Sequence, residues 1–299
     1  MKKKLIASLA ILPLLAALAG CSATNASAAS GSTAAKTVTV KIGTTDSSAD
    51  YWPVLEKKAL AQGIDIKLVN FSDYNQANPA LAQKQIDLNL FQHLQFLGTY
   101  NVSAGQNLTP IGATLIVPLG LYSTKYTSVK DIPKGGTIAI PNDPANLARG
   151  LNVLKSAGLV TFKGNPTQPT QADIDPAKSR VTVTLVDASQ TVASLPSVAG
   201  SIINNNFVQD AKIDPKSALY KDDPSSPAAQ PYINTFVSRA ADKNNKTFAE
   251  IVKLYHSPDV LALVEKQSKN TAVIVKNVSN AELQSVLDTV EKNIKASKK

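Results

Sequence analysis

From residue 38 onward, short apolar segments alternate with stretches that favour helices. In Val38–Ile42 the apolar residues occupy alternate positions, as a half-buried strand requires. A helix is expected from about Ala49 to Gln62, because Gly63 is the residue type that commonly follows a last helical turn. The apolar segment Ile64–Val69 then supplies another strand. This strand–helix–strand unit predicts an α/β fold with mostly parallel sheets.

The same alternation continues along the chain. Further strand candidates are Ile86–Leu90, Thr114–Tyr122, Thr137–Ile140, Val181–Val186, Ser201–Ile203 and Ile233–Val237. Two segments rich in Pro and polar residues, Gly164–Ser179 and Asp214–Pro231, are expected to be surface loops. Asp173 and Asp175 in the first loop lack the Gly turn and the distal Glu of a calcium loop, so no metal site is predicted there.

The N-terminus has the pattern of an export signal. Lys2, Lys3 and Lys4 precede the apolar run Leu5–Leu18, whose about fourteen residues are too few for a permanent membrane span. Leu18-Ala19-Gly20-Cys21 follows and has the form of a bacterial lipobox. We predict a signal peptide over residues 1–20 and lipidation of Cys21, with palmitate among its acyl chains, on the extracytoplasmic face of the cell membrane. The alternative is an ordinary Cys beyond an unrelated cleavage site.

Cys21 is also the only cysteine in the chain, so no intramolecular disulfide can stabilise an exported fold. Residues 21–36 consist almost entirely of small and polar types, which cannot bury enough apolar surface to offset the entropy of ordering. We therefore expect a flexible tether there. The remaining roughly 260 residues suffice for two lobes or one large domain.

The charge of the chain does not indicate a nucleic-acid partner. The formal net charge is +9, and removal of the three N-terminal lysines leaves 28 basic against 22 acidic residues. Lysines cluster at Lys57-Lys58 and Lys298-Lys299, and elsewhere the basic residues are dispersed among acidic ones, with no Arg-rich helix or interleaved aromatic residues. We interpret the charge as a source of solubility and of attraction to an anionic cell surface.

The segment Pro141–Arg149 has the pattern of a helix start. Asp143 is the expected N-cap and Pro144 the first helical residue. Asn146 and Arg149 would then share one face near free backbone amides and the positive end of the helix dipole. Such a site suits an anion, and Arg149 can hold a carboxylate by two parallel hydrogen bonds. An ordinary surface role for Arg149 remains the alternative.

A second group of candidate residues follows two predicted strands, where open α/β sheets bind ligands. Tyr74, Phe91 and His93 would bring aromatic rings to this edge, and rings pack well against a thioether. A core role is the alternative for Phe91 and the favoured interpretation for Phe71. His93 could instead be catalytic, which would require a partner.

These motifs recur in one known family. The matching pieces are Phe71-Ser72-Asp73-Tyr74 with Asn78 and Ala80-Leu81, Asp87–His93, Pro141–Pro144 with Asn146 and Arg149, Ile203-Asn204 and Pro231–Asn234. Together with the lipobox, they make the chain similar to the methionine-binding lipoproteins of the MetQ/NlpA family. The resemblance covers most of the chain.

The resemblance implies a two-lobed periplasmic-binding-protein fold of type II, with a ligand cleft between the lobes. Lobe 1 would comprise residues 37–122 and 233–299, and lobe 2 residues 123–232. The implied partners are methionine or a close analogue and the permease of an ABC importer, without a cofactor.

The resemblance also assigns roles to single residues. Arg149 would meet the ligand carboxylate, and Asn204 and Asn234 would hold the polar end of the ligand. The residues around the thioether would be Tyr74, Phe91 and His93, and Asn146 matches the family pattern too.

Two departures from the family pattern leave the ligand open. Leu94-Gln95-Phe96 and Ser197–Gly200 differ from the residues usual at these positions, and the run Asn204-Asn205-Asn206 leaves the matching Asn open. The candidates are L-methionine, D-methionine, a methionine-containing dipeptide and methionine sulfoxide.

The sequence does not favour two other classes of function, an exported enzyme and a structural surface protein. A secreted hydrolase would need a nucleophile with a base, but the chain has no G-x-S-x-G motif, no H-E-x-x-H motif and only two histidines, His93 and His256. A surface adhesin would show repeats or long low-complexity stalks, which the sequence lacks. We therefore predict a binding protein and not an enzyme.

Overall fold

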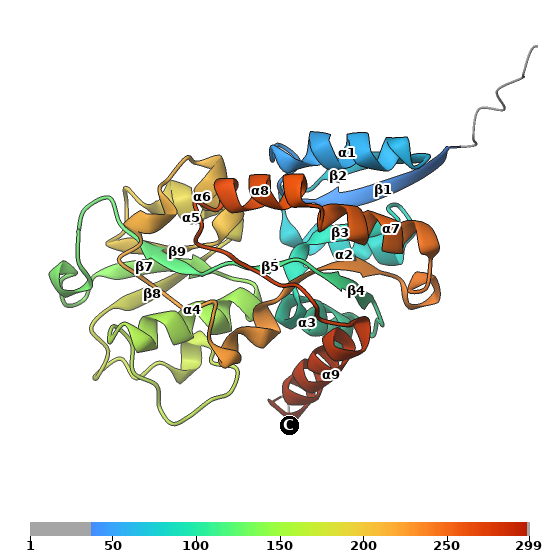
Figure 1. Cartoon of the computed structure of the whole chain (residues 1–299). Helices are drawn as coiled ribbons and strands as arrows, with labels where there is room; N and C mark the ends of the chain where they lie inside the picture. The colour runs from blue at the N-terminus through green and yellow to red at the C-terminus, as the bar shows by residue number, and fades with distance from the viewer. Residues whose placement is uncertain (1–36, 298–299) are drawn as a thin grey trace, which may run out of the picture. The chain divides into compact units, whose positions relative to one another are not determined.

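The computed structural model describes residues 37–297, which belong to one compact unit (Figure 1). The predicted signal peptide, Cys21 and the tether lie outside the described residues. The described part of the chain forms two five-stranded sheets, one two-stranded sheet and surrounding helices, so the predicted α/β class is confirmed.

The first sheet has the strand order β2-β1-β3-β11-β4. β1 (Val38–Thr44) runs parallel to β2 (Ile64–Asn70) and to β3 (Leu88–His93). β11 (Asn234–Ser238) is antiparallel to both β3 and β4 (Thr109–Ala113). The ends of β1 and β3 and the start of β11 therefore meet at one edge of the sheet.

The second sheet has the order β10-β6-β9-β7-β8. β7 (Thr137–Pro141) is parallel to β8 (Thr182–Val186) and β9 (Gly200–Ile203), whereas β6 (Gly120–Tyr122) is antiparallel to β9 and β10 (Tyr220–Lys221). The prediction of mostly parallel sheets is therefore wrong. The chain enters the second sheet through β6 and returns to the first sheet through β11, and both strands are antiparallel to their neighbours.

The predicted strand Thr114–Tyr122 is divided in two. β5 (Leu115–Ile116) pairs with β12 (Val273–Ile274) in the two-stranded sheet, and β6 belongs to the second sheet. Pro118 lies between β5 and β6, and its missing N–H cannot donate to a strand neighbour. Because the intervening residues leave the sheets, the backbone carbonyl of Val117 is free to accept from a side chain.

Helices cover both faces of the first sheet. They are α1 (Tyr51–Ala61), α7 (Lys246–Tyr255) and α8 (Pro258–Gln267) around one buried cluster, and α2 (Tyr74–Ala82), α3 (Leu94–Ala104) and α9 (Asn280–Ser297) around another. Trp52 and Phe236 are fully buried in the former, and Leu287 in the latter, where α9 lies beside α3 (Figure 1). The predicted end of the first helix is confirmed, since Gly63 has the left-handed φ of +73°.

The second sheet has its own core. Leu121, Ile138, Ile140 and Leu151 are fully buried in it. Its helices are α4 (Pro144–Ser156), α5 (Thr191–Ser194) and α6 (Asn205–Asp210). Short 3₁₀ helices span Val129–Asp131, Gln171–Asp173, Ala188–Gln190, Pro215–Ser217, Pro227–Tyr232 and Ala240–Asp242.

The two predicted loops differ in structure. Segment 164–179 contains a single 3₁₀ turn, whereas segment 214–231 also contributes β10 to the second sheet. The description of the second segment as a loop was therefore incomplete, because Pro and Ser residues obscured a two-residue strand. Over residues 37–297, no helix combines the length and the apolar character that a membrane crossing demands.

Candidate functional site

One cavity, of about 120 Å³, is lined by residues that follow strands of both large sheets. This volume is several times the roughly 10–15 Å³ that a cavity needs to hold one water molecule, so it has room for a small solute. All the residues predicted to bind a ligand line it: Tyr74, Phe91, His93, Asn146, Arg149, Asn204 and Asn234. The structure thus brings together side chains that are up to 160 positions apart in the chain.

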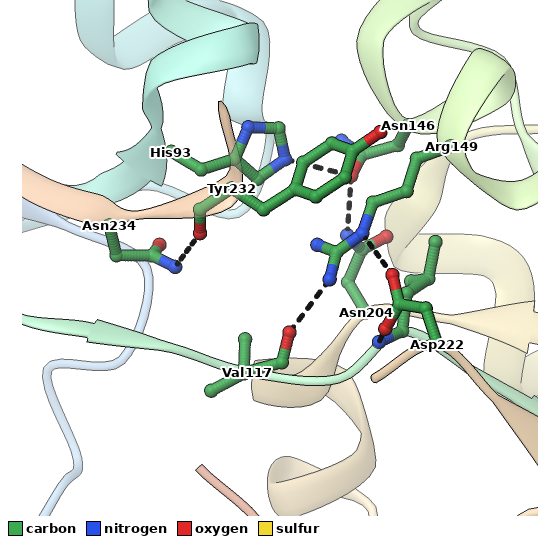
Figure 2. A network of polar contacts seen from close by, with 9 residues as sticks. His93, Val117, Asn146, Arg149, Asn204, Asp222, Tyr232 and Asn234 are labelled. Carbon is green, nitrogen blue, oxygen red and sulfur yellow. Dashed lines mark hydrogen bonds and ion pairs between the residues drawn. The ribbon is translucent and has the colours of Figure 1, made fainter. Parts of the chain in front are cut away.

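Arg149, on the second turn of α4, is only 3% exposed. Its Nε donates to Oδ2 of Asp222 at 2.7 Å, and its Nη2 donates to the carbonyl of Val117 at 2.8 Å (Figure 2). The guanidinium also lies 4.1 Å from the ring centroid of Tyr232. Within residues 37–297, Nη1 of Arg149 has no hydrogen-bond partner, so this immobilised cation retains free N–H donors.

The start of α4 has the predicted caps. Asp143 is the N-cap, Pro144 is the first helical residue, and the backbone N–H of Asn146 donates to Oδ1 of Asp143 at 2.9 Å. The side-chain amide of Asn146 also donates to the Asp143 carboxylate. The expected anion site at these amides is therefore already filled by the protein's own carboxylate, whose pKa is raised by burial. Binding of an external anion then depends on Arg149.

His93 connects β3 to α4. Its Nδ1 accepts from the backbone N–H of Phe96 at 3.1 Å, which assigns the proton to Nε2 and lets Nε2 donate to Oδ1 of Asn146 at 3.3 Å. Burial, followed by the positive charge of Arg149, lowers the pKa of His93 to about 3. His93 is therefore a neutral positioning group, and among residues 37–297 no carboxylate forms the hydrogen bond to it that a catalytic triad would require.

Three aromatic side chains, Tyr74, Phe91 and Phe96, line one part of the cavity, and Phe207 packs against Tyr74. The ring of Tyr74 lies 6.0 Å from those of Phe91 and Phe96 and 5.4 Å from that of Phe207, and Phe91 and Phe96 are 5.7 Å apart. Phe71 instead packs against the core between the first sheet and α9, as expected. The roles of Phe96 and Phe207 were not predicted from the sequence, although both have the ring chemistry that singled out Phe91.

Asparagines supply the polar part of the wall. Asn204 donates from Nδ2 to Oδ1 of Asn146 at 2.9 Å, and the Tyr74 hydroxyl donates to Oδ1 of Asn206. Oδ1 of Asn204 and Nδ2 of Asn206 are buried and have no hydrogen-bond partner within the described residues. Asn234 donates only a long hydrogen bond, of 3.4 Å, to the carbonyl of Tyr232 (Figure 2). These atoms offer a ligand both donors and acceptors.

Asp222 and Tyr232 are two further site residues that were not predicted from the sequence. Both orient Arg149, and both come from the proline-rich stretch around segment 214–231. An acidic residue in a polar loop carries no pattern that distinguishes an ion-pair partner from a solvated side chain. No group of His, Cys, Asp and Glu side chains in the described part of the chain is arranged to hold a metal ion.

Comparison with known proteins identifies the family. The family model for NlpA lipoproteins matches residues 40–276. The chain belongs to the NlpA lipoprotein family. Among NlpA relatives, a probable D-methionine-binding lipoprotein MetQ of Pasteurella multocida is 34% identical over 266 residues, which cover 87% of this chain and 94% of that protein.

Solved structures give the same result for the fold. The substrate-binding protein of a methionine transporter from Streptococcus pneumoniae is 35% identical, with a TM-score of 0.74 over 80% of this chain and 96% of that one. A nutrient-binding protein from Burkholderia cenocepacia, solved bound to methionine, is 32% identical, with a TM-score of 0.74 over 79% and 100%. The predicted family and the periplasmic-binding-protein fold are thereby confirmed.

Proposed function

We propose that this chain captures methionine or a close analogue outside the cytoplasm and delivers it to the permease of an ABC importer. The observation that carries this proposal is one cavity that combines the free N–H groups of Arg149 with the aromatic rings around Tyr74. The methionine-transport relatives and the methionine-bound neighbour support the same ligand class.

The proposed pose follows from the chemistry of the wall. The ligand carboxylate accepts from Nη1 of Arg149, a charge-assisted bond to a guanidinium that is almost fully buried. The thioether packs among Tyr74, Phe91 and the neighbouring rings, where each sulfur–aromatic contact contributes about 0.3–1.5 kcal/mol. The unpaired Oδ1 of Asn204 accepts from the ligand ammonium. The hydrogen bond from neutral His93 to Asn146 holds the end of β3 against α4, so that the two sides of the cavity keep their relative position.

We further propose that the chain is divided into lobe 1, residues 37–122 and 233–299, and lobe 2, residues 123–232. This division is supported by the sheets, since the first sheet takes all its strands from lobe 1 and the second takes β7, β8, β9 and β10 from lobe 2. The exception is β6 (Gly120–Tyr122), which lies at the boundary of lobe 1 and belongs to the second sheet. Several hydrogen bonds then join the lobes, among them those from Tyr74 to Asn206, from His93 to Asn146 and from Gln267 to Gln209. A ligand that contacts both walls favours the closed state, which docks on the permease.

The anchor is a separate part of the proposal. Residues 1–20 are removed as a signal peptide, Cys21 carries the lipid, and residues 21–36 tether the protein to the extracytoplasmic face of the membrane. The lipoprotein relatives support this location. Growth of an expressing bacterium with radiolabelled palmitate should label the wild-type protein and not Cys21→Ala. Equal labelling of both, or of neither, would contradict the anchor.

Equilibrium dialysis tests the proposed transport role. The chain from Ser22 to Lys299 retains the whole compact unit 36–299 and is unfolded and refolded to release any bound solute. We expect it to bind one equivalent of radiolabelled methionine and to return it chemically unchanged, with leucine as the control competitor. Recovery of a converted product would indicate an enzyme, and absence of retention by folded protein would reject a methionine ligand.

A further inference from the structure

A second cavity, of about 460 Å³, is lined by residues of α2, α3, α4 and the C-terminal end of α9. Its volume is within the range of about 300–1,000 Å³ that is usual for small-molecule sites. Tyr74 and Phe96 line both this cavity and the first one, whereas Arg149 lines only the first. The second cavity is therefore a separate space that shares a wall with the proposed methionine site.

Much of the wall of the second cavity is apolar. The apolar lining residues include Phe96 and Tyr100 of α3, Pro144 and Leu147 of α4, Pro169, and Ile294 of α9. Pro169 belongs to the segment 164–179, and the neighbouring Gln168 accepts from Nε2 of Gln95 at 3.3 Å, a hydrogen bond that holds this segment against α3. An apolar ligand body that enters the cavity is removed from water, which favours binding.

Asp143 is the one charged side chain among the described residues that line this cavity, and it is 6% exposed. Its carboxylate accepts from the backbone N–H of Asn146 at 2.9 Å and from the side-chain amide of Asn146 at 3.0 Å. These donors are neutral, and no Lys, Arg or His among residues 37–297 forms an ion pair with Asp143. Burial, followed by the charge of Asp143, raises the pKa of Tyr74. A buried carboxylate without a cation favours a ligand that supplies one.

The Ser and Thr hydroxyls of the wall offer hydrogen-bond acceptors. Each donates its own proton within the chain: Thr99 to the carbonyl of Gln95 at 2.8 Å, Ser103 to that of Tyr100 at 3.2 Å, Thr170 to Oδ2 of Asp173 at 2.7 Å and Ser297 to the carbonyl of Ile294 at 2.9 Å. A hydroxyl that donates keeps lone pairs for a ligand. Nε2 of Gln168 adds a donor, but a neutral one, which does not compensate an anion placed beside Asp143. The polar part of the wall therefore suits a ligand that donates hydrogen bonds and carries positive charge.

We infer that the second cavity binds a small organic ammonium ion with an apolar body. Its ammonium group pairs with Asp143, and its body packs against Phe96, Tyr100 and Leu147. This site goes beyond the proposed capture of methionine and does not depend on it. A carboxylate of the same shape is disfavoured because it would lie beside Asp143, and an alcohol lacks the charge that the carboxylate requires.

Calorimetric titration of the chain from Ser22 tests this inference with three probes of matched shape: 4-phenylbutylamine, 4-phenylbutanol and 4-phenylbutyrate. We expect one equivalent of the amine to bind about ten- to hundredfold more tightly than the alcohol, the range of a hydrogen bond to a charged group. The carboxylate should bind more weakly than the alcohol. Saturating methionine should not displace the amine, because the two ligands occupy different cavities.

Two variants locate the probe. Ser103→Trp places an indole at an exposed position of the cavity wall and should weaken the amine at least about tenfold, whereas Ser285→Trp, at an exposed position of α9 outside the wall, should not change its affinity. Asp143→Asn keeps a side-chain oxygen for the helix cap but removes the charge. It should reduce the affinity for the amine to that for the alcohol and change the alcohol by less than about twofold.

The comparison of the amine with the alcohol uses the wild type, so it decides the question even if Asp143→Asn does not fold. Equal affinity for these two probes, or no binding of the amine to folded protein, would overturn the inference. Displacement of the amine by methionine, or unchanged amine binding in Ser103→Trp, would place the probe elsewhere and overturn it too. If the amine binds as expected but methionine does not bind, the second site stands and only the proposed function fails.

Discussion

Replacement of Arg149 by Ala is the most informative change to the cavity. The guanidinium is 3% exposed, forms an ion pair with Asp222, donates to the carbonyl of Val117 and stacks on Tyr232. A ligand carboxylate at Nη1 would therefore lose a buried, immobilised partner. Truncation of one member of such a buried charge pair costs about 2–5 kcal/mol, mostly because the other charge stays buried and unpaired.

This free energy corresponds to a loss of affinity of about 30-fold to several thousandfold for methionine, which calorimetric titration measures directly. Arg149→Lys keeps the charge but not the planar fork, so its affinity should lie between those of the wild type and Arg149→Ala. Arg180→Ala is the control, because Arg180 donates to backbone carbonyls away from the cavity. A folded Arg149→Ala protein that binds methionine within about twofold of the wild type would refute the carboxylate assignment.

Three further predictions concern closure, pH and packing. Tyr74→Phe removes the hydroxyl that donates to Asn206 and should weaken methionine binding about threefold to tenfold in calorimetry, without a change in stoichiometry. The pKa of His93 falls from 6.5 to about 3 on folding, so stability is lost as the pH drops through this range. Denaturant unfolding of the wild type should give a free energy of unfolding that is about 2 kcal/mol lower at pH 5 than at pH 7 because of this group. His93→Gln should lack this difference. Leu287→Ala, in the contact between α9 and α3, should reduce the free energy of unfolding by about 2–5 kcal/mol and leave the affinity unchanged.

The structure also shows which features the sequence could predict. Strands such as β1 and β7 were found because alternating or continuous apolar residues reflect burial, which is a local property. The cap at Asp143 was found because capping depends on residues within one turn. The same holds for Gly63, whose positive φ few other residue types adopt readily.

Strand direction and long-range partners could not be predicted in this way. β6 and β11 are antiparallel to their neighbours because the chain passes between sheets there, a property of the whole topology. The ion pair of Arg149 with Asp222 joins residues 73 positions apart, and nothing near Asp222 marks it as a partner. The amides of α4 were expected to bind a ligand anion, but the side chain of the cap residue itself occupies them.

The central claim is that the cavity binds a methionine species. Calorimetric titration of the refolded chain from Ser22 with L-methionine, D-methionine, glycyl-methionine and leucine tests it most directly. We predict one-to-one binding of at least one methionine species, and at least about tenfold weaker binding of leucine, which lacks the thioether that packs against Tyr74 and Phe91. Leucine binding as tight as that of every methionine species, or no binding of any ligand to folded protein, would contradict the account.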